Sequence, residues 1–71
     1  MKLPEAVERY GIARKEPKNG NRIGVDRKDN GRYSVSMRRR ATGSLKLLFD
    51  DLFLGEAIVK CGEDGWEEGS A

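Results

Sequence analysis

The chain has 71 residues, of which 14 are Lys or Arg and 12 are Asp or Glu, with one Cys and no His. A chain of this length forms one small domain with a limited core and no room for a large active-site cavity. The lack of histidine and the single cysteine exclude zinc sites built from Cys and His and remove the commonest general base. We therefore expect a protein that is not an enzyme, holds no metal or cofactor and has no small-molecule substrate.

The sequence also bears on the compartment. No run approaches the ~20 consecutive apolar residues that span a bilayer, and the first residues, MKLPEAVERY, lack the apolar run of a secretory signal. The single thiol, Cys61, fits a reducing environment. We expect a soluble, cytoplasmic protein without a membrane partner.

The charges are divided along the chain. Residues 9–46 carry twelve Lys or Arg and three acidic residues, a net charge of +9, whereas residues 47–71 carry one lysine and seven acidic residues, a net charge of −6. A basic segment followed by an acidic one is typical of nucleic-acid-binding proteins. The alternative is that the two groups of charges only solvate different faces of the molecule.

The first predicted element is a short helix over about residues 4–10. Apolar side chains recur at helical spacing on one face, at Leu3, Ala6, Val7 and Tyr10. Pro4 suits the first turn and Gly11 the position just past the end. The next segment, residues 13–21, is charged, contains a proline and an Asn-Gly pair, and has no periodicity, so it predicts a loop.

Three antiparallel strands are expected next, over about residues 22–26, 32–39 and 45–49. The first two form a hairpin, because the Asp-Asn-Gly sequence at residues 29–31 is typical of a tight turn. Apolar and polar residues alternate, so one face of the sheet is covered and the other is wet. The expected inward side chains are Ile23, Val25, Tyr33, Val35, Met37, Leu45, Leu47 and Phe49.

A second helix is expected over about residues 52–61, because two aspartates precede it and Gly62 follows it. This helix covers the apolar face of the sheet, which gives a single α+β domain over residues 1–62. The acidic, glycine-containing sequence of residues 63–71 indicates a flexible tail. We expect Trp66 in this tail to pack on the apolar side of the sheet.

Short motifs in the hairpin resemble a known family. The motifs are Gly24-Val25, Gly31-Arg32-Tyr33 and Met37-Arg38, followed downstream by Phe49-Asp50 and Glu56-Ala57. In this register the chain resembles, over about residues 22–58, the ethylene-response-factor type of DNA-binding domain. That domain occurs in plant transcription factors and in phage and mobile-element proteins. The resemblance implies a three-stranded sheet packed on a helix, with the sheet placed on duplex DNA.

The outward face of the predicted sheet supplies the candidate DNA contacts. Guanidinium and ammonium groups suit the acceptors of guanine, and the resemblance puts Lys28 and Arg38 at positions that contact DNA, so we expect these two to contact bases. The other basic side chains are expected to bind phosphates. The two serines are expected to hydrogen-bond to a phosphate or to a base. The candidate residues are Arg22, Arg27, Lys28, Arg32, Ser34, Ser36, Arg38, Arg39, Arg40 and Lys46.

The sequence departs from the family at Ile23 and Asp26, where the family commonly has arginine, and at Asn30, where it has an aromatic residue. These departures favour an alternative: a phage-encoded inhibitor, similar in size and composition to anti-CRISPR proteins, that binds a host protein or nucleoprotein complex. The basic sheet or the acidic residues 63–68, acting as a phosphate mimic, would then form the contact. A third reading is a small structural subunit that docks on an assembly.

Overall fold

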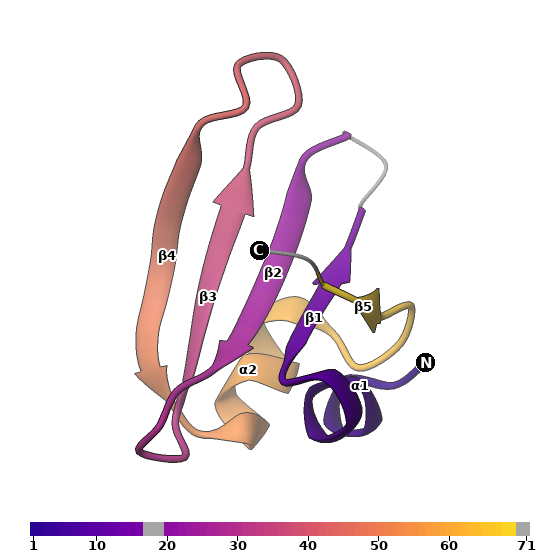
Figure 1. The fold of residues 1–71 in the computed structure, drawn as a ribbon, viewed down its shortest axis with the longest axis vertical. Coiled ribbons are helices and arrows are strands. Elements are labelled where there is room, and N and C mark those ends of the chain that lie inside the picture. Colours follow the sequence, from indigo (N-terminus) through magenta and orange to yellow (C-terminus); the bar gives the residue numbers. More distant parts are fainter. Residues whose placement is uncertain (17–19, 70–71) are drawn as a thin grey trace.

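The computed structural model describes residues 1–16 and 20–69, which contain two helices and five strands (Figure 1). In chain order these are α1 (Leu3–Tyr10), β1 (Ile12–Lys15), β2 (Arg22–Arg27), β3 (Tyr33–Arg38), β4 (Leu45–Leu52), α2 (Leu54–Cys61) and β5 (Glu67–Glu68). The strands form one antiparallel sheet in the order β4-β3-β2-β1-β5. Neither of these two helices has the length and apolar character needed to cross a bilayer.

The α+β class is confirmed, but the sheet has five strands within the described ranges rather than the three that were predicted. One extra strand, β1, lies in the segment predicted as a loop, of which residues 17–19 are outside the described residues. Ala13 is paired with Val25 and Lys15 with Ile23. Four residues with one buried side chain are too few to show a strand period, so β1 depends on its partners.

The second extra strand, β5, lies in the segment predicted as a flexible tail, of which residues 70–71 are outside the described residues. Glu67 and Glu68 pair with β1, and the preceding Trp66 is fully buried, as its predicted packing requires. The Trp66 indole N–H donates to the Gly62 carbonyl at 3.0 Å. Residues 63–69 are therefore part of the domain, because one large buried side chain anchors an otherwise polar segment.

Both helices end where the sequence predicts. Gly11 follows α1 with φ of 78° and Gly62 follows α2 with φ of 87°, conformations that glycine adopts without strain. The start of α2 differs from the prediction, because β4 extends to Leu52 and includes the two aspartates. The helix is instead capped by the Glu56 carboxylate, which accepts a hydrogen bond of 3.0 Å from the Phe53 N–H.

Both helices pack on one face of the sheet. The cross-strand neighbours Ala13, Val25 and Val35 share that face and are fully buried. Among the described residues, the buried core consists of Leu3, Ala6, Val7, Ala13, Val25, Val35, Leu52, Ala57 and Trp66. Neither helix packs on the other face, which we call the open face. Figure 1 shows α2 behind the sheet, and both helices lie at the end away from the β3–β4 turn.

Strand β4 contains two irregularities in its pairing with β3. Leu47 is opposite Ser36 but Phe49 is opposite Val35, so Leu48 is an extra residue. Because of this bulge, the side chains before and after it that would share a face point to opposite faces. The prediction that Leu45 and Leu47 point inward is therefore wrong. Both lie on the open face and are 64% and 58% exposed. A second irregularity precedes Leu52, where Asp51 has φ of 57°.

Candidate nucleic-acid interface

The open face brings together the polar side chains of β2 and β3. Arg22 is the cross-strand neighbour of Arg38, and Asp26 of Ser34. Ser36 lies between these two pairs along the strands, opposite Gly24. Of the ten candidate residues, Arg22, Ser34, Ser36 and Arg38 therefore share one face, which the alternation of the sequence predicts.

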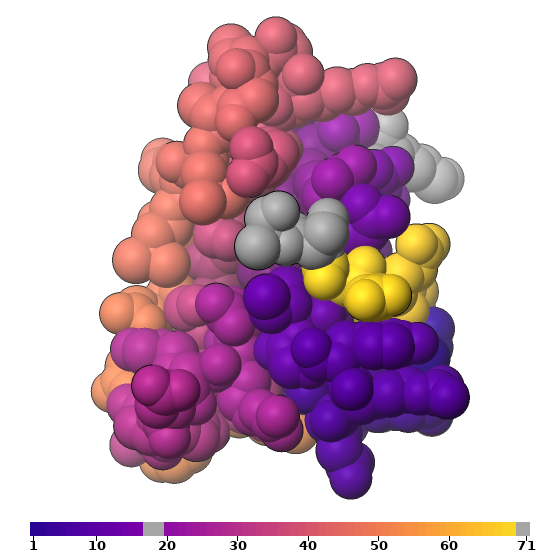
Figure 2. Space-filling model, in the orientation of Figure 1, coloured from indigo at the N-terminus to yellow at the C-terminus, as the bar shows by residue number. Residues whose placement is uncertain are grey.

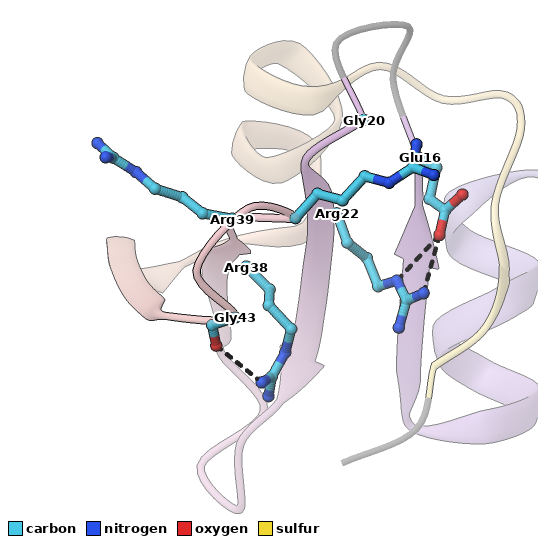
Figure 3. Close-up of a pocket in the computed structure, with 7 residues that line it drawn as sticks. Glu16, Gly20, Arg22, Arg38, Arg39 and Gly43 are labelled. Carbon is cyan, nitrogen blue, oxygen red and sulfur yellow. Dashed lines mark hydrogen bonds and ion pairs between the residues drawn. The ribbon is translucent and has the colours of Figure 1, made fainter.

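Arginines gather at the helix-free end of the open face, around a hollow of about 370 Å³ (Figure 3). We call this feature the arginine hollow. It is lined by Glu16, Gly20, Arg22, Arg38, Arg39, Arg40 and Gly43. The lining residues come from the ends of β2 and β3 and from the connections that follow β1 and β3. Figure 2 shows the β3–β4 end at the top of the view, clear of α1 at the bottom.

Two guanidinium groups of the arginine hollow are held by neighbours. Arg22 donates from Nε and Nη2 to the Glu16 carboxylate, at 3.2 and 2.8 Å, and Arg38 donates from Nη1 to the Gly43 carbonyl at 3.1 Å (Figure 3). The Arg39 side chain points away from the hollow. The hollow thus combines two arginines that are hydrogen-bonded to neighbours with an arginine at its rim.

The electrostatics of the arginine hollow favour an anion. The hydrogen bond and charge of Arg22 lower the pKa of Glu16, and the charges of Arg14 and Arg40 lower it further. Arg22 and Arg38 are like charges directly opposite each other on neighbouring strands, an arrangement that destabilises a sheet. Glu16 is the one carboxylate among the described lining residues, so positive charge remains in excess.

Three candidate residues lie at the other end of the β2–β3 hairpin, and two of them, Lys28 and Arg32, have side-chain partners. The Lys28 ammonium contacts the Asp50 carboxylate at 2.9 Å, which lowers the pKa of Asp50 and raises the pKa of Lys28. The Arg32 guanidinium lies 3.7 Å from the centre of the Phe53 ring. Arg27 is opposite Tyr33, on the face that carries the core. The structure does not bring these residues to the arginine hollow.

Lys46 is also separated from the arginine hollow. It is opposite Met37, whereas the adjacent pair, Leu45 and Arg38, lies on the open face. Successive side chains of a strand point to opposite faces, so Lys46 projects from the side that bears the helices. The predicted cluster of ten residues is thus divided between two faces and two ends of the sheet.

Sequence reasoning missed one arginine of the open face. Arg14 in β1 is opposite Gly24 and contacts Glu67 at 3.9 Å. Because Gly24 has no side chain and Ser36 a short one, a second hollow of about 310 Å³ lies between Arg14, Arg22 and Leu45. No signal in residues 13–21 marks Arg14, since the segment lacks strand periodicity.

Comparisons with protein-family models, with curated proteins and with solved structures find no match to this chain. The resemblance to the ethylene-response-factor type of domain therefore stays a prediction from the hairpin motifs. In residues 1–16 and 20–69 no group of three or more His, Cys, Asp or Glu side chains is placed to hold a metal ion. The arginines and the open face are the features on which a function can be argued.

Proposed function

We propose that the protein binds duplex DNA through the open face, with the arginine hollow against the phosphate backbone. The observation that carries this proposal is the set of four arginines, residues 22 and 38–40, gathered at the helix-free end of the sheet beside one described carboxylate. Guanidinium groups donate paired hydrogen bonds to phosphate oxygens. The projecting β3–β4 end has the form of a β-ribbon, which the major groove admits.

The positions suggest different tasks for the side chains. Arg14, Arg22, Arg39 and Arg40 surround the edge of the open face and are suited to phosphates, which set the register of a complex. Arg38 lies between Arg22 and Leu45, on the sheet itself, and is the best candidate for a base edge. Arg27, Lys28, Arg32 and Lys46 stay outside this surface and are not required by the proposal.

A second candidate function is supported by a different observation. Leu45 and Leu47 are more than half exposed on the same face as the arginines. Apolar side chains beside basic ones suit an acidic protein partner, as the inhibitor alternative requires, better than they suit a phosphate backbone. A phage-encoded inhibitor of a host protein or nucleoprotein complex is therefore the second candidate.

The DNA proposal is tested by fluorescence anisotropy with a labelled duplex at about 50 mM and about 200 mM salt. Four phosphate contacts, those of Arg14, Arg22, Arg39 and Arg40, predict that log K falls with log salt at a slope of about −3 to −4. Arg38→Ala removes the proposed base contact and is expected to weaken binding by about 1–3 kcal/mol with little change in the slope. Arg9→Ala is the matched control, because it removes the same charge from α1, which packs on the other face.

Two outcomes separate the candidates. Absence of salt-sensitive binding by the parent chain at micromolar protein rules out the DNA proposal. Equal effects of Arg38→Ala and Arg9→Ala show that DNA binds by general charge rather than at the open face. For the second candidate, Leu45→Ser with Leu47→Ser is expected to abolish capture of a protein partner while leaving DNA affinity nearly unchanged.

A further inference from the structure

The arginine hollow is concave, which a contact with a passing phosphate backbone does not require. Its volume of about 370 Å³ is several times the roughly 30 Å³ that one water molecule occupies, so a whole phosphate group can enter. Its lining comes from the ends of β2 and β3 and from the connections beside them, so it lies at the end of the open face. We propose that the arginine hollow binds a phosphate monoester, so that the protein recognises the terminal phosphate of a DNA strand. This inference rests on the proposed DNA-binding function.

Among the described residues, the donors of the arginine hollow are hydrogen-bonded to neighbours through only some of their N–H groups. Each guanidinium has five N–H donors. Arg22 uses two nitrogens on Glu16, and Arg38 uses one on the Gly43 carbonyl. Because both side chains are already hydrogen-bonded to neighbours, binding of an anion to their other donors costs less conformational freedom of the protein.

The charge of the arginine hollow matches a monoester better than a diester. The four guanidinium groups of the lining, those of Arg22 and Arg38 to Arg40, and the carboxylate of Glu16 leave three positive charges. A phosphate monoester carries about −1.5 to −2 at neutral pH, whereas each internal phosphate of DNA carries a single negative charge. An anion of this charge also offsets the repulsion between the opposed Arg22 and Arg38.

The shape of the arginine hollow depends on two glycines. Gly20 and Gly43 have φ of 82° and 70° and add no side chain to the lining. A Cβ atom at Gly20 would lie 3.2 Å from Cδ and 3.5 Å from Nη1 of Arg40, so a larger residue would displace this arginine. Gly20 therefore keeps the Arg40 side chain at the lining of the hollow, where its guanidinium can meet an anion.

The test uses two duplexes of identical sequence, one with 5′-phosphates and one with 5′-hydroxyls, in fluorescence anisotropy. We expect the parent chain to bind the phosphorylated duplex about tenfold more tightly, the gain from one charge-assisted contact. Arg40→Gln is expected to remove this preference. Arg9→Gln is the matched control, because it removes the same charge from α1, which packs on the other face of the sheet, and it is expected to keep the preference.

The pH dependence adds an independent measurement. The second pKa of a phosphate monoester is about 6, so the preference is expected to shrink as the pH falls below that value, while binding of the 5′-hydroxyl duplex is unchanged. Circular dichroism of both variants establishes that each is folded. A preference that survives at low pH would show that the second charge of the phosphate plays no part, and would overturn the inference.

The outcomes distinguish this inference from the DNA proposal. If the parent chain binds both duplexes equally, the terminal-phosphate inference fails and DNA binding stands. If it binds neither duplex, both fail. Inorganic phosphate is the third arm: an affinity equal to that of the phosphorylated duplex would show a site for free phosphate and would overturn recognition of a strand end.

Discussion

Lys15 illustrates how a single charged side chain can serve the fold rather than a ligand. It projects from β1 on the face that carries the core, and its Nζ donates to the carbonyls of Cys61, at 2.7 Å, and Asp64, at 3.1 Å. The same ammonium lies 4.9 Å from the centre of the Trp66 ring. It therefore compensates the negative end of α2 and holds the connection to β5.

We expect Lys15→Met to lower the free energy of unfolding by about 2 kcal/mol, because methionine keeps the aliphatic stem but loses two charge-assisted hydrogen bonds. Urea unfolding followed by circular dichroism measures the change. Lys46→Met is the control, since Lys46 is exposed, and we expect it to stay within about 0.5 kcal/mol of the parent chain. Equal losses in the two variants would show that Lys15 has no special role.

At the scale of elements, the β2–β3 hairpin is where sequence and structure agree best. Its strands alternate cleanly and its turn contains Asn30 and Gly31, so both pattern and turn residues give the same answer. The strands β1 and β5, with four and two residues, are too short to show a period. They form because the edge of β2 and the burial of Trp66 provide partners, which no local pattern reveals.

A residue of the candidate site could be placed from the sequence only where the strand that carries it could be predicted. Arg22, Ser36 and Arg38 lie in the clean hairpin, and their shared face follows from the alternation. Arg14 was missed with its strand. The leucines of β4 were placed on the wrong face, because a bulge shifts the alternation by one residue and leaves no mark in a run such as LKLLF.

The Lys28–Asp50 pair ties the β2–β3 turn to β4 and makes stability depend on pH. The hydrogen bond from Lys28 lowers the pKa of Asp50 in the folded state, and Arg22 does the same for Glu16. A lowered carboxyl pKa contributes stability that is complete above the unfolded pKa and is lost as the pH falls through the folded pKa.

We therefore expect the melting temperature to fall as the pH is lowered from about 5 towards about 2, the range in which carboxyl groups titrate. Asp50→Asn removes one of the two contributions, and its melting temperature is expected to fall less steeply over the same range. Asp29→Asn, at a turn residue with an exposed side chain, is the matched control. An unchanged pH profile in Asp50→Asn would contradict this account.

At the scale of the whole molecule, the described N-terminal residues are joined to the segment after α2. The Met1 ammonium donates to the Trp66 carbonyl at 2.7 Å, and the Trp66 N–H donates to the Met1 carbonyl at 2.8 Å. The Leu3 N–H likewise donates to the Glu63 carbonyl at 2.7 Å. These bonds and the Trp66 side chain hold α1, β1 and β5 together.

Trp66→Ala is expected to remove about 3–5 kcal/mol, because it leaves a large cavity among buried neighbours. A domain of 71 residues has a total stability of about 4–10 kcal/mol, so this variant is expected to be partly or fully unfolded at room temperature. Thermal unfolding by circular dichroism measures the change. Phe53→Ala is the comparison, since Phe53 is 59% exposed, and the loss of stability is expected to be about 1 kcal/mol.

The position of β5 has a consequence for how folding is observed. Strands β1 to β4 each pair with their neighbours in the chain, whereas β5 pairs Glu68 with Ala13 across the rest of the sequence. Contacts between distant residues form later than local hairpins, because a long loop must close first. Trp66 is the one tryptophan of the chain and is buried beside that pairing. In a refolding experiment, the fluorescence of Trp66 is therefore expected to report the pairing of β5 with β1. Far-ultraviolet circular dichroism is expected to report the earlier formation of the hairpins that carry the open face.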